Sequence, residues 1–134
     1  MAYNLDEKHI MLTEQKLNVV FPKSYRKAIM ANNGGLVISP LGEEEGVWFL
    51  YPFFDDTDKK RLKKTSIDIV RENQTAWNQY GLPQNLYAIG HSDDEYLVFK
   101  KTENNLLEDA VYKYHHSYNL ELLADDFSML THES

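Results

Sequence analysis

Residues 86–116 decide the fold class, and they read LYAIGHSDDEYLVFKKTENNLLEDAVYKYHH. Three runs rich in branched and aromatic residues, at 86–90, 96–101 and 110–116, are separated by polar segments that hold the turns. In the second and third runs, successive side chains suit the two opposite faces of a sheet. Strands that follow one another through short turns pair antiparallel. This stretch therefore predicts three consecutive antiparallel strands.

The segments on the N-terminal side predict helices first and then two more strands. Apolar residues at helical spacing indicate a first helix over residues 5–19, whose apolar face includes Val20, and a second helix over 22–32. Gly34 and Gly35 then supply backbone conformations that end a helix. Two strands follow, at residues 36–39 and 47–53, joined by a polar turn.

A third helix is predicted behind a capping box at residues 65–68, because a hydroxyl and an acid three residues later satisfy exposed N–H groups. A final helix is predicted to start near Asp125 or Asp126, whose carboxylates can cap it, and to bury Phe127 and Leu130. The residues expected on one face of the third helix are Ile67, Val70, Gln74, Trp77 and Tyr80.

The order of these elements predicts an α+β fold. Strand runs joined by short turns favour an antiparallel sheet, here of about five strands, packed with N-terminal, middle and C-terminal helices. The chain has 134 residues, a length that suits one domain, and no stretch has the composition of a linker or a repeat. We therefore expect a single domain over residues 1–134.

Composition narrows the class of protein. The formal net charge is -7 and there is no cysteine, which excludes disulfides, thiolate metal sites and a cysteine nucleophile. An acidic balance disfavours direct binding to nucleic acid or to an anionic membrane. The start of the chain lacks the pattern of a targeting peptide, and no apolar run reaches the ~20 residues that span a bilayer. We expect a soluble, cytoplasmic protein.

The charge is distributed unevenly. Residues 40–58 hold six acids and no base, residues 59–64 (KKRLKK) hold five bases, and residues 90–134 hold ten acids against three lysines. The basic run is predicted to form a solvated turn that offsets the acids before it. The acids expected to form a surface for a basic partner are Glu43, Glu44, Glu45, Asp55, Asp56, Asp58, Asp93, Asp94 and Glu95.

An aromatic block lies beside the first acidic region. Alternation sends Trp48, Leu50 and Pro52 to one side of a strand and Phe49, Tyr51 and Phe53 to the other. Most of these rings are expected in the core. Any ring exposed beside the acids would contribute much of the binding energy, because buried aromatic residues dominate interfaces.

No metal, cofactor or catalytic centre is predicted. The acidic runs lack the alternating ligands and turn glycine of a calcium loop. His115 and His116, adjacent on a strand, are expected to point to opposite faces and so not to share an ion. His91 is the one histidine near acids in the sequence; a turn hydrogen bond is favoured over a catalytic pair with an aspartate, because no nucleophile or oxyanion hole is near.

A set of motifs resembles a known family. The motifs are Glu14 in an early helix, Phe21-Pro22-x-x-Tyr25, Asn33-Gly34-Gly35, Leu82-Pro83 before the strand at 86–90, the strands at 96–99 and 111–114, and Phe127-x-x-Leu130. Together they are similar to the SUKH superfamily, which includes yeast cell-wall regulators of the Smi and Knr type. The resemblance implies an α+β fold with a central antiparallel sheet and no enzymatic activity. Many members place glycine or one acid in the turn before the fourth strand, where this chain has Ser92-Asp93-Asp94-Glu95.

The resemblance also implies a function. Bacterial domains of this kind are implied to be immunity proteins, which bind and neutralise a cognate polymorphic or contact-dependent toxin, often a nuclease or deaminase. A toxin that grips phosphates must present Lys and Arg, which fits the acidic runs. The first hypothesis is therefore a non-enzymatic immunity protein with a basic toxin as its partner. The alternative is a regulatory protein-interaction module like the eukaryotic members.

Overall fold

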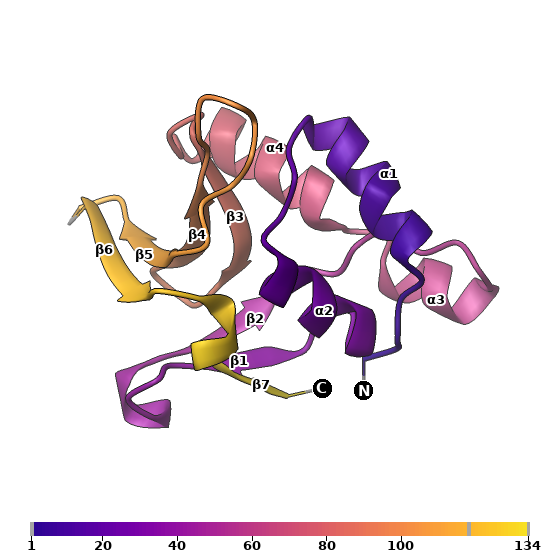
Figure 1. The fold of residues 1–134 in the computed structure, drawn as a ribbon, viewed down its shortest axis with the longest axis horizontal. Helices are drawn as coiled ribbons and strands as arrows, with labels where there is room; N and C mark the ends of the chain where they lie inside the picture. Colours follow the sequence, from indigo (N-terminus) through magenta and orange to yellow (C-terminus); the bar gives the residue numbers. More distant parts are fainter. Residues whose placement is uncertain (1, 118, 134) are drawn as a thin grey trace.

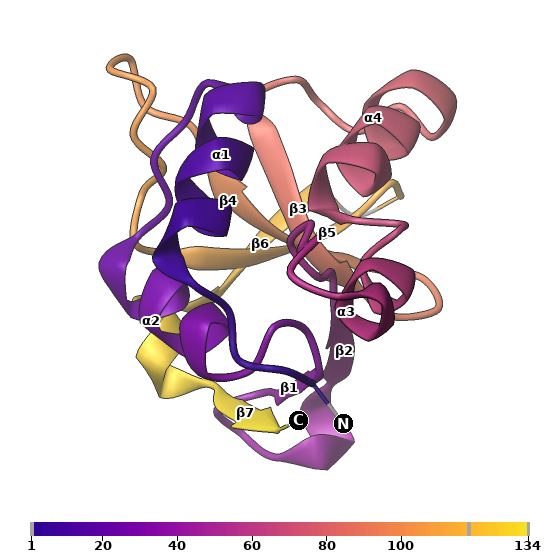
Figure 2. The same cartoon turned by 90° about the vertical axis from the view of Figure 1, so that its right-hand side faces the viewer.

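The computed structural model describes residues 2–117 and 119–133, and it has one antiparallel sheet whose strands are ordered β6-β5-β4-β3-β2-β1-β7. Figures 1 and 2 show that the sheet curves and that α1, α2 and α4 lie on its concave side. The strands are β1 (Leu36–Ile38), β2 (Val47–Leu50), β3 (Leu86–His91), β4 (Tyr96–Lys100), β5 (Val111–His115), β6 (Asn119–Ala124) and β7 (Thr131–Glu133). The predicted α+β class with an antiparallel sheet is confirmed.

The first two helices lie where the sequence predicts them. α1 (Glu7–Leu17) is capped by the side chain of Asp6, and α2 (Lys23–Ala31) follows Pro22. Val20 does not lie on the apolar face of α1, and its side chain is 48% exposed. The helix ends at Leu17 because Asn18 takes a left-handed conformation, so helical spacing no longer places Val20.

Glu14 joins the two helices. Its Oε2 accepts a hydrogen bond from the backbone N–H of Phe21 (2.8 Å) and lies 3.3 Å from the Nε atom of Arg26 in α2. The carboxylate thus satisfies a backbone donor at the entry to α2 and is neutralised by an arginine of that helix. Glu14 therefore links α1 to α2 through a hydrogen bond and an ion pair.

The basic run is a helix and not a solvated turn. Residues 59–64 form α3 (Lys59–Lys64), because Asp58 caps it by accepting from the backbone N–H of Arg61. The predicted local offset of charge is confirmed, since Arg61 forms ion pairs with Asp58 at 2.6 Å and with Asp55 at 3.6 Å.

The third predicted helix is α4 (Ile69–Gln79), and part of its predicted apolar face is confirmed: Val70 and Trp77 pack against the core, whereas Ile67, Gln74 and Tyr80 are exposed. Asp68 caps the helix, not Thr65, whose hydroxyl accepts instead from the backbone N–H of Asp55. The later start turns Ile67 out of the helix, and it is 61% exposed. The buried residues of α4 are Ile69, Asn73 and Ala76.

The sheet has seven strands where about five were predicted. β6 continues from β5 through a turn, and β7 pairs with β1 although its three residues, Thr131–Glu133, carry no apolar pattern. The predicted final helix is a single 3-10 turn, η2 (Phe127–Met129), capped by Asp126. Phe127 and Leu130 are buried as predicted.

The aromatic block follows alternation only as far as β2 extends. Trp48 and Leu50 are buried and Phe49 is 62% exposed, but Tyr51 and Phe53, which follow the strand, are also buried. Beyond Leu50, where β2 ends, successive side chains are no longer constrained to opposite faces. The predicted core role of most of these rings is confirmed, with Phe49 as the exposed exception.

Candidate interaction site

A cleft of about 760 Å³, which we call the acidic cleft, opens at one end of the sheet. It is walled by α4, by the turn between β3 and β4 (residues 92–95), and by residues at the ends of β2, β4 and β5. The lining combines carboxylates with phenol rings: Glu72, Asp93, Asp94 and Glu95 with Tyr51, Tyr80, Tyr96 and Tyr114. No lysine or arginine lines it.

Strand register places one wall of the cleft. His91 on β3 lies opposite Tyr96 on β4, and Tyr96 lies opposite Tyr114 on β5. Residues directly opposite in an antiparallel pair share a face of the sheet. Three strands therefore present His91, Tyr96 and Tyr114 side by side.

The helix α4 forms the other wall, and hydrogen bonds from its side chains to the backbone of β3 hold it in place. Asn73 Nδ2 donates to the carbonyl oxygen of Ala88 (2.8 Å), and Asn73 Oδ1 accepts from the N–H of Ala88 (2.7 Å). Trp77 Nε1 donates to the carbonyl oxygen of Leu86 (2.9 Å). The helix is thus fixed on the strand. The α4 residues that line the cleft are Glu72, Thr75 and Gln79, at i, i+3 and i+7, together with Tyr80 at the helix end.

The cleft carries an uncompensated negative charge. In the part of the chain that the structure describes, Glu72, Asp93, Asp94 and Glu95 form no ion pair. Burial raises the pKa of the Tyr51 phenol, and the Glu72 carboxylate raises it further. Burial, Tyr80 and Glu72 likewise raise the pKa of Tyr96. Both shifts favour the neutral phenol beside the carboxylates.

His91 forms the predicted kind of contact with an unpredicted partner. Its Nδ1 lies 2.9 Å from the hydroxyl oxygen of Tyr51, and the two rings are 5.3 Å apart. The partner comes from the segment after β2 and not from the acidic turn. This hydrogen bond satisfies the hydroxyl of a largely buried tyrosine at the base of the cleft.

The predicted acids do not form one surface. Asp93, Asp94 and Glu95 line the acidic cleft. Residues 43–45 form an exposed 3-10 turn, η1 (Glu43–Glu45), between β1 and β2. Since His91 lies opposite Phe49 near the start of β2, both acidic turns lie at the same end of the sheet. Asp56 and Asp58 lie beside α3, which Figure 1 shows on the side of the molecule away from β3, β4 and β5.

Asp55 was predicted as a surface acid, and this is wrong. It is only 2% exposed, and its carboxylate lies 3.3 Å from His9 Nε2 and 3.6 Å from Arg61 Nε. It also accepts hydrogen bonds from the N–H and the hydroxyl of Thr57. A burial of this depth requires partners for the charge, and these donors supply them.

The His9–Asp55 pair was missed by the sequence analysis, which selected His91 as the one histidine near acids. Forty-six positions separate the two residues, so no local pattern points to them. His9, Asp55 and Asp56 bring possible metal ligands within 4.8 Å of one another. The Asp55 carboxylate already accepts from Thr57 and faces Arg61, an arrangement that fits an internal ion pair joining α1 to α3.

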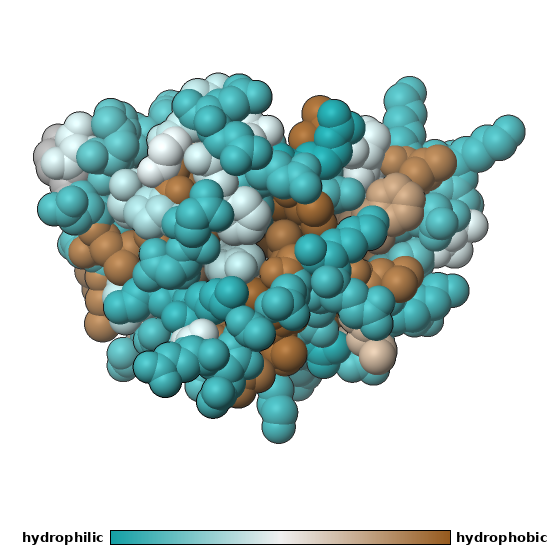
Figure 3. Space-filling model, turned by 90° about the horizontal axis from the view of Figure 1, so that it is seen from above, coloured by the Kyte–Doolittle hydropathy of each residue, from teal (hydrophilic) through white to brown (hydrophobic). Residues whose placement is uncertain are grey.

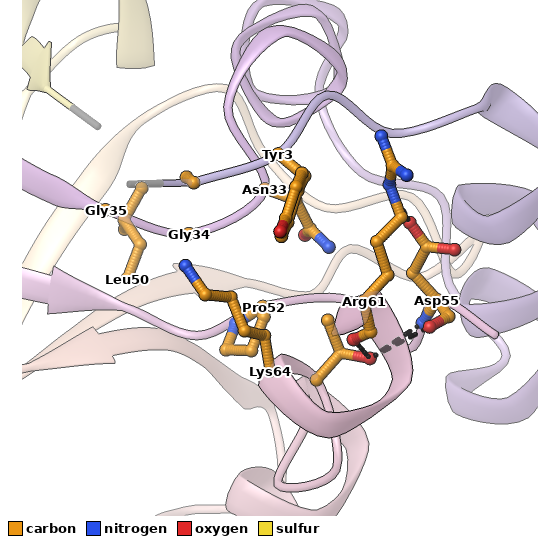
Figure 4. A pocket seen from close by; sticks show the side chains of 11 residues that line it. Tyr3, Asn33, Gly34, Gly35, Leu50, Pro52, Asp55, Arg61 and Lys64 are labelled. Carbon is orange, nitrogen blue, oxygen red and sulfur yellow. Dashed lines mark hydrogen bonds and ion pairs between the residues drawn. The ribbon is translucent and has the colours of Figure 1, made fainter. Parts of the chain in front are cut away.

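A smaller pocket lies beside this ion pair. Figure 4 shows Tyr3 beside Asn33, and Arg61 and Lys64 also line the pocket. Both cations are engaged with the same ring: Arg61 lies 4.6 Å and Lys64 lies 5.1 Å from the centroid of Tyr3. The volume of about 260 Å³ is much smaller than that of the acidic cleft.

The prediction for His115 and His116 is wrong in its geometry. Their rings stack, with centroids 4.7 Å apart and planes 17° apart, and do not point to opposite faces. The reason is that β5 ends at His115, so His116 already belongs to the following turn. Strand alternation does not apply across that boundary.

Exposed apolar side chains are the other surface feature. Met11 and Leu12 on α1 are about half exposed, as are Val20 and Leu106, which pair through their backbones. Seen from above, the molecule is largely hydrophilic with separate apolar patches (Figure 3). These apolar side chains offer contact area but no charge that would select a partner.

The curved sheet, the helices on its concave side and the open acidic cleft define an α+β domain with a recessed acidic surface. The chain belongs to the SMI1 / KNR4 family (SUKH-1), whose model matches residues 4–131. This match confirms the resemblance to the SUKH superfamily. A search of curated proteins finds no match. Among the described residues, no helix is long and apolar enough to span a membrane.

Proposed function

We propose that this protein is a non-enzymatic immunity protein that binds and neutralises a cognate polymorphic or contact-dependent toxin, one that acts on nucleic acid. The observation that supports the proposal is the acidic cleft, whose four carboxylates have no cationic partner in the described chain. A toxin that grips phosphates presents lysine and arginine, and carboxylates of an inhibitor compete for that surface. The protein works in the cytoplasm and needs no cofactor, nucleic acid or membrane.

The acids at the sheet end have different roles in this proposal. Asp93, Asp94 and Glu95 contact the toxin directly, because they line a cavity that a partner can enter. Glu43–Glu45 act at longer range and speed the encounter, since they are exposed at the same end without a cavity of their own. Asp56 and Asp58 lie outside the interface, and Asp55 is structural.

The test uses the toxin domain encoded beside the gene. The full chain is co-expressed with it, and toxicity, complex stoichiometry and dissociation rate are measured. We expect protection and a one-to-one complex. Asp93→Lys/Asp94→Lys/Glu95→Lys should speed dissociation about 100-fold, because like charges facing each other at an interface cost several kcal/mol. The matched control Glu43→Lys/Glu44→Lys/Glu45→Lys changes the net charge equally and should speed it less than about fivefold.

The alternative, a regulatory interaction module, is supported by the family itself, whose description names SMI1 and KNR4. It predicts several weak partners and no protection from a neighbouring toxin. If no toxin encoded nearby binds the protein, the immunity proposal fails. If the toxin binds and both triple variants dissociate at the wild-type rate, the proposal survives but its assignment of the cleft is wrong.

A further inference from the structure

The acidic cleft is large enough to admit a whole side chain. Its volume of about 760 Å³ falls within the range of about 300–1,000 Å³ that is typical of ligand sites in proteins. The pocket at Tyr3 is smaller, and both cations on its rim already contact that ring. Of these two pockets of the described residues, the acidic cleft therefore combines the larger space with groups that have no charged partner.

The walls of the cleft are aromatic faces. Tyr80 is 64% exposed at the end of α4, and Tyr96 and Tyr114 lie half-buried on neighbouring strands. A phenol face carries partial negative charge and attracts a cation within about 6 Å of the ring centroid. Within this protein, two other tyrosines bind cations in this way: Tyr3 with Arg61, and Tyr112 with Lys100. The cleft tyrosines have no such contact among the described residues.

Glu72 is the acid that points to a specific ligand. Its side chain is half-buried in the wall of the cleft, where it receives no hydrogen bond and no ion pair from the described residues. Beside the partly buried wall of the cleft, an opposite charge is attracted to this carboxylate more strongly than in open solvent. A cationic donor that enters the cleft gains from this stronger attraction, which is a source of affinity absent from the exposed acids of Glu43–Glu45.

Arginine matches this lining better than lysine. A guanidinium is planar, so it donates two parallel hydrogen bonds to a carboxylate while its flat face stacks on an aromatic ring. The cleft offers both partners together, carboxylates from α4 and from residues 92–95 beside tyrosine rings. An ammonium group is a hydrated point charge that cannot make both contacts in this way.

We infer that the acidic cleft is a receptor for an arginine side chain of the protein partner, which pairs with Glu72 and the acids of the β3–β4 turn and stacks on the tyrosine wall. The inference rests on the proposed function in one respect: the arginine belongs to the toxin. The site itself is a property of this chain and is tested without a toxin.

The experiment titrates the full-length, ¹⁵N-labelled protein with N-acetyl-argininamide and, separately, with N-acetyl-lysinamide, and follows the backbone amides by NMR. We expect the arginine probe to shift the amides of residues 91–96 and of α4 at millimolar concentration, and to bind at least about fivefold more tightly than the lysine probe. Glu72→Gln and Tyr80→Ala should each weaken binding of the arginine probe at least about fivefold. The control Glu43→Gln/Glu44→Gln/Glu45→Gln, which removes three charges, should leave it unchanged.

Two results would overturn the inference. The first is equal binding of the two probes, with shifts spread over all acidic segments, which would indicate simple charge attraction. The second is that the Glu72→Gln and Tyr80→Ala variants both bind the arginine probe as tightly as the wild type, while their amide spectra show the native fold. The proposed function is tested separately. If the protein binds the arginine probe in the cleft but binds no toxin, the arginine site stands and the immunity proposal fails.

Discussion

The two acidic turns, Glu43–Glu45 and residues 93–95, carry the same number of charges at the same end of the sheet. Behind residues 93–95 lie α4 and the strands β4 and β5, which carry Tyr96 and Tyr114, and together these elements make a cavity. Glu43–Glu45 are exposed in a hairpin and line none of the three pockets described among these residues. Asp93 and Asp94 are exposed too, but together with the half-buried Glu95 they share a cavity with Glu72 and tyrosine rings, so equal charge meets a different environment.

We expect the largest effect on stability when the glycine near each turn, Gly90 or Gly46, is replaced by alanine. A Cβ at Gly90, just before the cleft turn, would lie 2.4 Å from the carbonyl oxygen of Phe49, a backbone atom of the adjacent strand. We expect Gly90→Ala to lower the free energy of unfolding by about 3 kcal/mol, because β2 and β3 must separate to make room. Urea denaturation measures the loss.

Gly46→Ala is the matched variant in the hairpin turn. There the added Cβ would lie 2.4 Å from the Cη2 atom of Trp48, a buried ring that must tilt within the core although no strands need to separate, and the backbone φ of +155° disfavours alanine. We expect a loss of about 2 kcal/mol. A smaller loss for Gly90→Ala than for Gly46→Ala would contradict the view that the cleft turn depends on a tight seam between β2 and β3.

The strands and the first two helices could be predicted because their signals are local. Alternation and branched residues mark β3, β4 and β5, and the left-handed glycines after α2 mark its end. The same signal was present in β6, where Leu120 and Leu122 alternate with Glu121, and it was not used. β7 had no such signal, since pairing with β1 is what makes its three polar residues a strand.

The site could be predicted only in part. Asp93, Asp94 and Glu95 follow from the sequence, but the tyrosine wall depends on register, which sets Tyr96 opposite Tyr114. The burial of Asp55 depends on His9, which is remote in sequence. One usable signal was overlooked: the polar residues Glu72, Thr75 and Gln79 recur at i, i+3 and i+7 and so mark a face of α4.

Alkaline pH provides the next test, because only the cleft turn lies beside a buried tyrosine. Burial and Glu72 raise the pKa of Tyr51, so the folded state keeps its phenol neutral while the unfolded chain ionises near pH 10. The stabilising contribution is complete below pH 10 and is lost as the pH rises above it. At pH 7, Tyr51→Phe should cost about 1 kcal/mol through loss of the hydrogen bond to His91.

At pH 11 the order should change. The wild type loses up to about 1.4 kcal/mol for each pH unit above 10 through Tyr51, and phenylalanine has no proton to lose. The variant should therefore equal or exceed the wild type in urea denaturation at pH 11. An unchanged stability difference between pH 7 and pH 11 would show that ionisation of Tyr51 is not coupled to unfolding.

The smallest expected effect is a gain of stability. Residues 93–95 share their cleft with Glu72, whereas Glu43–Glu45 repel only one another in open solvent. Asp93→Asn/Asp94→Asn/Glu95→Gln should therefore raise the free energy of unfolding by about 0.5 kcal/mol at low ionic strength, as surface charge changes do. Glu43→Gln/Glu44→Gln/Glu45→Gln should change it by less than about half as much. In 1 M salt the screening length falls to about 3 Å, and the two triple variants should become equally stable. An equal gain in the free energy of unfolding for both triple variants at low salt would instead mean that Glu72 and the cleft turn do not repel each other. Charge repulsion would then destabilise the cleft no more than it destabilises the hairpin.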